Sequence, residues 1–388
     1  MAGKKKVIMY CPKWYPSIGG METNIRNQIF NSDNFNYTIL TNGFGKYPAN
    51  ERLCQNASVI RIPPNETDYS ITKNRNHKIA FPLRLAHDLI RIKNVNKLLE
   101  KESCDILHVH YPYIPHTIFK SSQLMKKAIF KKSMAIKNNS AQILTLHGLL
   151  SSTSKSKLVR EYEMAVLERY DTIICVDKNL KEFVLSNFPS KNIHYIPNSI
   201  DTSMFCYKTM EQGQKLRVGF IGRLESSRGI ELLTALAGNL PEYVDLSIIG
   251  SGSKIMLKKF KEKEKTSRYK FFTNIPNDRI PAYLHNIDIL FNPVVPDGIS
   301  RITMEAMACG RPVIMLEAPN RGPVISGKTG FLVKPNIESI LATLNSIYAD
   351  RAILDEYSRN CRNEIEANYS NEVIIPQIET LYNSTIAI

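Results

Sequence analysis

Short apolar runs alternate with helical stretches along the whole chain, and this pattern occurs twice. Strands that alternate with helices of about ten to fifteen residues form βαβ units, so the sheets should be mostly parallel. Helices are predicted at 79–100 and 155–170. The predicted strands are 6–10, 37–41, 58–62, 105–110, 143–147, 172–176 and 193–196, and then 216–221, 246–249, 271–272, 287–291, 312–315 and 331–333.

The length of the chain indicates two domains. At 388 residues it exceeds what a single core usually organises, and 43% of its residues are hydrophobic. The segment 197–215 is polar and lacks a clear period, which favours a linker there. We therefore predict two doubly wound α/β domains, 1–198 and 199–365, facing a central cleft. A C-terminal helix, about 366–388, is a candidate to complete the first, and ligands should bind at the carboxyl ends of the strands.

Cysteine usage and hydropathy indicate the compartment. The seven cysteines are odd in number and lie far apart, with no CxxC pair. This argues against a disulfide framework and against a zinc site. No run approaches the length of about 18 apolar residues that a membrane span requires. We therefore expect a cytoplasmic protein.

Positive charge is concentrated in the first half. Residues 1–200 hold 29 Lys and Arg against 15 Asp and Glu, whereas the rest hold 22 against 21. A basic amphipathic helix is predicted at 118–137, where lysines surround an apolar stripe. Such a helix is typical of membrane-surface binding. We therefore predict that the protein binds an anionic membrane surface or a phosphate-bearing lipid acceptor and lies on the membrane as a peripheral protein. The alternative is that the lysines of this helix form a solvated face over an ordinary core stripe.

One stretch combines a buried acid with an anion site. Ser300 can cap a helix that Gly310 and the following proline can end. From 302 to 309 this helix is apolar nearly all round, except for Glu305, so that carboxylate should be buried and must have a partner. Asp297 lies in the preceding loop, beside a helix N-terminus suited to an anion. The pair fits a phosphorylated polyol; alternatively, Glu305 forms a structural ion pair with an arginine and Asp297 is a turn residue.

Three other strand exits carry candidate residues. Gly19 and Gly20 precede a helix, where backbone N–H groups can approach a phosphate, although an ordinary turn has the same pattern. Arg223 and Arg228 lead into an amphipathic helix and could hold a diphosphate, or could be surface arginines. His147 ends a strand, where a hydrogen-bonded structural histidine is the common alternative. His108 and His110 are weaker candidates at the previous strand end.

Six motifs between residues 15 and 333, in the right order, resemble those of retaining glycosyltransferases with the GT-B fold (glycosyltransferase family 4, group 1 type). The resemblance implies two Rossmann-like domains. It places the ribose on Glu305 and the donor sugar on Asp297 and the backbone of Gly298, Ile299 and Ser300. It also implies that Arg223 and Arg228 neutralise the leaving diphosphate, and that His147 lies against the sugar. Gly222 and Gly252 match turns near the nucleotide, and Gly19 and Gly20 match a loop that faces the diphosphate and the acceptor.

Three positions depart from the family pattern. Asp297 replaces the usual Glu, as it does in trehalose-phosphate synthases, Arg228 replaces Lys, and Ser199 replaces Gly. Arginine keeps the charge but differs in geometry from an ammonium group. These departures leave open a non-catalytic relative that binds a sugar or stabilises a partner.

The resemblance implies a hexosyltransferase that uses a nucleotide-diphosphate sugar as co-substrate, without metal or other cofactor. A lipid-linked or membrane-associated glycan precursor is the expected acceptor, as in polysaccharide biosynthesis. A sugar-nucleotide epimerase of the same fold is a lesser alternative. The basic charge also permits nucleic-acid binding, but no RRM, KH or zinc motif accompanies it, so we expect no nucleic-acid partner.

Overall fold

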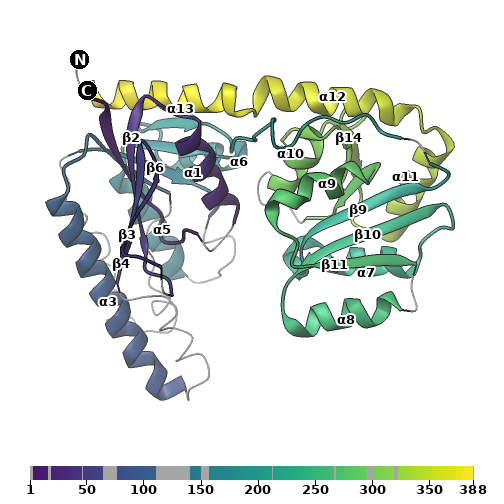
Figure 1. Cartoon of the computed structure of the whole chain (residues 1–388), viewed down its shortest axis with the longest axis horizontal. Helices are drawn as coiled ribbons and strands as arrows, with labels where there is room; N and C mark the ends of the chain where they lie inside the picture. Colours follow the sequence, from purple (N-terminus) through teal and green to yellow (C-terminus); the bar gives the residue numbers. More distant parts are fainter. Residues whose placement is uncertain are drawn as a thin grey trace. The chain divides into compact units, whose positions relative to one another are not determined.

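In the computed structural model, which describes most of the chain, the protein folds into two compact units (Figure 1). The first unit contains residues 1–197 and 375–388, and the second contains residues 198–374. The described residues are 3–15, 19–45, 47–63, 77–110, 140–149, 157–211, 213–265, 268–294, 300–318 and 322–387.

The sheet of the first unit has eight described strands in the order β3-β4-β2-β1-β5-β6-β7-β8. All neighbours are parallel except the edge strand β3, which is antiparallel to β4. The strand order reverses between β1 and β5, which makes a topological switch point. The strands are β1 (Lys5–Tyr10), β2 (Phe35–Asn42), β3 (Asn50–Cys54), β4 (Ala57–Ile62), β5 (Ile106–Val109), β6 (Ala141–Leu146), β7 (Thr172–Cys175) and β8 (Asn192–Tyr195).

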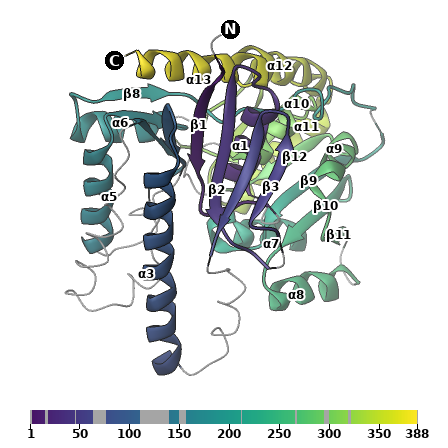
Figure 2. The same ribbon diagram turned by 60° about the vertical axis from the view of Figure 1, so that its left-hand side comes forward.

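Helices cover both faces of this sheet (Figure 2). On one face, α3, α5 and α6 bury apolar side chains against alternate residues of the strands. On the other face lie α1 and α13, and Tyr382 of α13 packs edge-on against Phe35 at 5.2 Å between ring centroids. The helices are α1 (Gly20–Phe30), α3 (His77–Lys101), α5 (Lys157–Arg169), α6 (Lys178–Asn187) and α13 (Asn371–Ile386).

The second unit has a parallel six-stranded sheet in the order β11-β10-β9-β12-β13-β14. One of its cores lies under α7, α8 and α11, and the other lies under α9, α10 and α12. The strands are β9 (Leu216–Arg223), β10 (Val244–Ser251), β11 (Tyr269–Thr273), β12 (Ile289–Asn292), β13 (Val313–Leu316) and β14 (Gly330–Val333). The helices are η2 (Ser226–Arg228), α7 (Ile230–Gly238), α8 (Lys254–Glu264), η3 (Asn277–Arg279), α9 (Ile280–His285), α10 (Arg301–Ala308), α11 (Ile337–Ala349) and α12 (Ile353–Asn368).

The predicted fold class is confirmed. Each predicted strand is present, with ends that differ by no more than two residues. The prediction missed β3, because its sequence Asn-Glu-Arg-Leu-Cys has no apolar alternation and its side chains are only partly buried. Edge strands of this kind carry charge on their open side and therefore lack the pattern of a buried strand.

Candidate functional site

The carboxyl edge of the second sheet brings two loops together at the switch point between β9 and β12. Gly229, which follows η2, has φ +68°, a conformation that favours glycine. A Cβ built on it would lie 2.0 Å from the carbonyl oxygen of Pro293, in the loop after β12. The backbones of the two loops, which follow β9 and β12, are therefore in contact, and this contact requires a residue without a side chain at position 229.

Two arginines lie in the β9 exit. Arg223 is exposed and pairs with Glu225, with 3.1 Å between Nη2 and Oε1. Arg228 is half-buried, and its guanidinium has no hydrogen-bond or ion-pair partner among the described residues. Burial, and then the charge of Arg223, lower the pKa of Arg228, and the charge of Glu225 only partly opposes this. A half-buried cation beside a second cation is electrostatically unfavourable until an anion arrives.

Glu305 lies on α10, which follows the β12 exit, and is 5% exposed. Its Oε1 accepts a hydrogen bond from Arg301 Nε at 2.8 Å. Burial raises the pKa of Glu305, and the Arg301 charge and hydrogen bond oppose this rise. The expected burial and partner are confirmed, and the partner is an arginine, as the structural alternative required. Within the described chain only Oε1 is engaged, which leaves Oε2 for a ligand.

The rest of this edge consists of turns. Ser300 is the N-cap of α10, as predicted, but its side chain makes no capping hydrogen bond. Gly222 is the penultimate residue of β9, and Gly252 follows β10 beside the backbone of Leu224 in the loop after β9. Gly310 has φ +74° and ends α10. Asp297, Gly298 and Ile299 lie outside the described residues.

In the first unit, Gly19 and Gly20 begin α1, but an acid already occupies this helix end. Gly19 is the N-cap, and the buried Glu22 accepts hydrogen bonds from its own N–H and from that of Gly19. A Cβ on Gly19 would lie 2.5 Å from Glu22 Oε2. The Glu22 carboxylate can therefore bond to the N-cap backbone only because residue 19 has no side chain. Burial raises the pKa of Glu22. An incoming phosphate would compete with this carboxylate for the Gly19 N–H.

His147 follows β6, one strand away from the switch point of the first sheet. Its Nε2 lies 3.4 Å from Nδ1 of His110, which follows β5. Burial lowers the pKa of His147 to about 4, so the ring is neutral near pH 7. The structure therefore joins His147 to His110, which the sequence suggested only as a weaker candidate.

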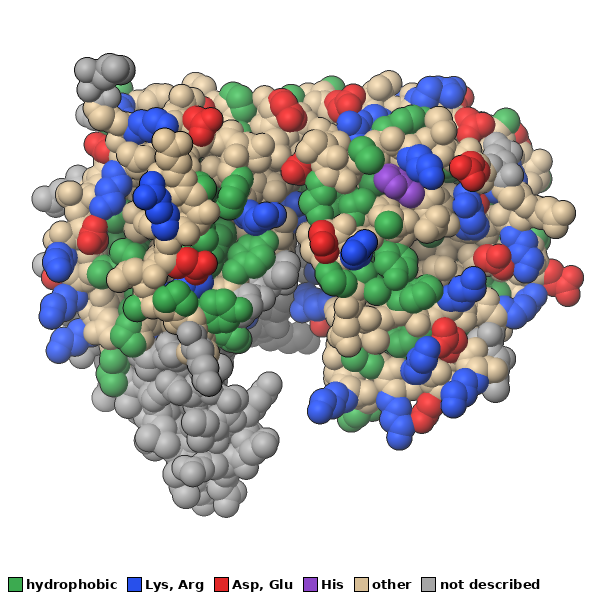
Figure 3. Space-filling view, in the orientation of Figure 1, with side chains coloured by type: hydrophobic (Ala, Val, Ile, Leu, Met, Phe, Trp, Pro, Cys, Tyr) green, Lys and Arg blue, Asp and Glu red, His purple; other side chains and the backbone are tan. Residues whose placement is uncertain are grey.

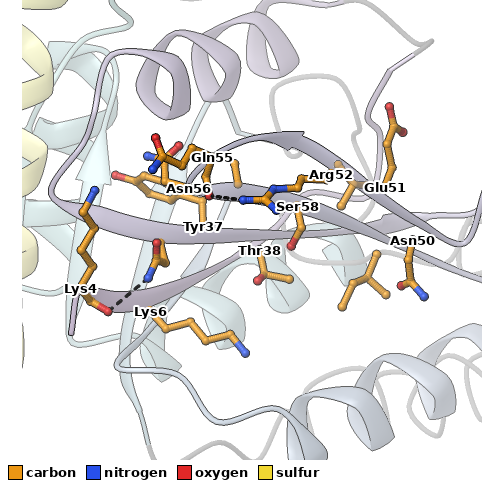
Figure 4. A pocket seen from close by; sticks show the side chains of 14 residues that line it. Lys4, Lys6, Tyr37, Thr38, Asn50, Glu51, Arg52, Gln55, Asn56 and Ser58 are labelled. Carbon is orange, nitrogen blue, oxygen red and sulfur yellow. Dashed lines mark hydrogen bonds between the residues drawn. The ribbon is translucent and has the colours of Figure 1, made fainter.

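A polar hollow of about 790 Å³ also lies in the first unit, at the amino ends of β1, β2 and β4 (Figure 4). It is at the opposite end of the strands from His147. Two of its cations are already engaged: Lys6 pairs with Glu102, and Arg52 donates to the carbonyl oxygens of Cys54 and Gln55. Ligands of such sheets bind at the carboxyl ends of the strands, so we do not assign the expected ligand site to this hollow.

Sequence reasoning missed two residues that contact the candidate groups. Arg301 lies four residues before Glu305, a spacing at which helical side chains meet, so this partner could have been named. Glu225 lies two residues after Arg223, and no periodic pattern marks it.

The basic stretch 118–137 lies outside the described residues. On the face drawn in Figure 3, basic and acidic side chains are interspersed over the second unit, in agreement with its near-neutral balance. Within the described ranges, no helix is both long and apolar enough to cross a membrane. These ranges also contain no group of three His, Cys, Asp or Glu side chains that could hold a metal ion.

Comparison with known proteins agrees with this arrangement. Residues 18–204 match the family model described as Glycosyltransferase Family 4, and residues 215–350 match the model Glycosyl transferases group 1. A capsular polysaccharide biosynthesis glycosyltransferase of Staphylococcus aureus is 23% identical over 80% of this chain and 87% of its own length.

Two solved structures share the fold. Sucrose-phosphate synthase from Thermosynechococcus elongatus has a TM-score of 0.76 at 18% identity, over 99% of both chains. The HepE protein of Anabaena, solved in complex with UDP-glucose, has a TM-score of 0.70 at 16% identity, over 98% of this chain and 100% of its own.

Proposed function

Because this chain belongs to the glycosyltransferases of the GT-B fold, we propose that it transfers a hexosyl group from a nucleotide-diphosphate sugar, without a metal ion. The observation that carries the donor assignment is Arg228: it is half-buried, lies beside Arg223, and forms no ion pair in the described part of the chain. A diphosphate supplies the missing negative charge.

The second unit binds the donor in this proposal. Arg223 and Arg228 bind the diphosphate, and Oε2 of Glu305 accepts hydrogen bonds from the ribose hydroxyls. When the sugar leaves, the same two guanidiniums stabilise the charge that develops on the diphosphate. Asp297 and the backbone of 298–300 are assigned to the sugar by the family motif.

The proposed reaction retains the anomeric configuration, as the resemblance of the 297–305 segment to retaining enzymes implies. His147 and the Gly19-Gly20 loop are assigned to the transferred sugar and the acceptor. A proton NMR spectrum of the first-formed product tests retention: a product with the opposite anomeric configuration to the donor would contradict it.

The acceptor proposed is a lipid-linked or membrane-associated glycan precursor. The excess of Lys and Arg in residues 1–200 supports it, because anionic surfaces attract basic segments. We expect the protein to float with phosphatidylglycerol-containing vesicles and not with neutral phosphatidylcholine vesicles at the same salt concentration. Equal binding to the two would contradict the electrostatic part of the proposal.

A thermal shift with UDP, GDP and ADP tests the donor site. A ligand at 100 times its Kd stabilises the native state by about 2.7 kcal/mol, which is a shift of roughly several degrees for domains of this size. We expect one nucleoside diphosphate to raise the Tm, and the matching monophosphate to raise it less, because it offers the arginines less charge. If none of the three raises the Tm at millimolar concentration, the donor assignment is wrong.

A further inference from the structure

A chain of hydrogen bonds connects His108 with the C-terminal helix, and His110 beside it bonds to His147. Side chains alternate along a strand, so His108 on β5 and Thr145 on β6 point to the same face of the sheet, as do His110 and His147, which directly follow these strands. Helix α13 lies on that face and contributes Tyr382. The Tyr382 hydroxyl lies 2.5 Å from Nδ1 of His108, and Nε2 of His108 lies 2.7 Å from the Thr145 hydroxyl.

These side chains form a cluster whose first part is Tyr382, His108 and Thr145. The proton positions in this part follow from the Tyr382 hydroxyl. Its oxygen accepts a hydrogen bond from Gln28 Nε2 at 2.8 Å, and burial raises the pKa of the phenol, which therefore keeps its proton. The acceptor for that proton is Nδ1 of His108. The proton of His108 is then on Nε2 and is donated to the hydroxyl of Thr145.

The second part of the cluster is the bond between His110 and His147. Burial lowers the pKa of both rings, so both are neutral, and one must donate to the other. Nε2 of His110 is buried and has no hydrogen-bond partner in the described chain. A proton there would be an unsatisfied buried donor, and such N–H groups are rare and costly. The proton of His110 is therefore on Nδ1 and is donated to Nε2 of His147.

We propose that His110 is a positioning residue that fixes the tautomer of His147. Because Nε2 of His147 accepts from His110, its own proton is on Nδ1, and the ring has no free lone pair. His147 then acts as a hydrogen-bond donor to a hydroxyl oxygen of the transferred sugar and not as a general base. This inference rests on the proposed function only for the identity of the substrate; the tautomers themselves are a property of the free protein.

Two substitutions of His110 separate donation from packing. The amide nitrogen of asparagine can take the place of Nδ1, whereas that of glutamine takes the place of Nε2. We expect His110→Asn to keep kcat within about threefold of wild type and His110→Gln to lower it about tenfold, in keeping with the loss of one buried hydrogen bond. Nucleotide affinity should be unchanged in both variants. An equal loss of kcat in the two would contradict the proposal.

Nitrogen-15 NMR of the histidine rings gives a readout that needs no turnover. We expect Nε2–H for His108 and Nδ1–H for His110 and His147 in the wild type, and a mixture of tautomers for His147 in His110→Gln. Tyr382→Phe is the matched control, because it removes a hydroxyl from the same cluster while its ring can still pack on Phe35. The rings of His108 and His110 are in contact, at 4.1 Å between centroids and tilted by 34°, without a hydrogen bond between them in the described chain, so this variant should leave the His147 tautomer and kcat unchanged.

Wild-type His147 protonated on Nε2 would overturn the inference, even if every nucleotide experiment succeeded. Conversely, if no nucleoside diphosphate binds while the tautomers are as expected, the proposed function fails and the hydrogen-bond assignment stands.

Discussion

Glutamine in place of Glu305 is expected to lower kcat/KM for the sugar nucleotide by about a hundredfold or more. A carboxylate that accepts hydrogen bonds from ribose hydroxyls contributes about 1.5–3 kcal/mol per bond, and glutamine removes the charge while it keeps the shape. Steady-state kinetics of donor consumption measure the effect. Some stability should also be lost, because Arg301 loses its ion pair with a residue that is 5% exposed.

A second ion pair in the chain provides the control. Arg362 and Glu366 are also four residues apart on a helix and also pair through Nε and Oε1, at 2.7 Å, but Glu366 is exposed. Glu366→Gln should leave kcat/KM unchanged. Near-normal transfer by Glu305→Gln would show that the Arg301–Glu305 pair is structural only, and the ribose assignment would then be withdrawn.

Methionine in place of Arg228 is expected to weaken nucleoside diphosphate binding about tenfold to a hundredfold and to leave the Tm of the free protein unchanged or higher. The first effect follows from the loss of hydrogen bonds to a charged ligand, worth about 1.5–3 kcal/mol. The second follows because Arg228 is half-buried and lies beside Arg223, and both conditions lower the pKa of Arg228. Calorimetric titration and thermal unfolding measure the two effects.

Two further variants complete this experiment. Arg228→Lys should retain most of the affinity, because it keeps the positive charge. Arg359→Met removes an exposed arginine from α12 and should change neither quantity. A lower Tm for Arg228→Met together with unchanged nucleotide binding would identify Arg228 as a structural residue and contradict its assignment to the diphosphate.

Most of the fold could be predicted from the sequence because the strands buried on both faces are nearly continuous apolar runs. The burial of Glu305 could also be predicted, because it interrupts an otherwise apolar helix. The alternation of strand side chains places His108, His110 and His147 on one face, but nothing local marks His110 as the partner of His147.

Other contacts could not be predicted because they join residues far apart in the chain. Tyr382 and His108 are separated by 274 positions. The need for glycine at position 229 arises from the carbonyl oxygen of Pro293, a neighbour that only the folded sheet provides. The occupation of the α1 N-terminus by Glu22 depends on side-chain conformation, which the paired glycines alone do not reveal.

The place of α13 in the sequence, after the second unit, decides the order in which the two units can be completed. Residues 198–374 form the second unit, whereas the first unit also requires residues 375–388. Tyr382 bonds to His108 and Glu379 bonds to Ser32, so the part of the first sheet that α13 covers is exposed until these residues have been added. Because residues 375–388 follow the second unit in the chain, the first unit can be completed only after residues 198–374 have been synthesised. The unit that begins the chain is therefore completed last.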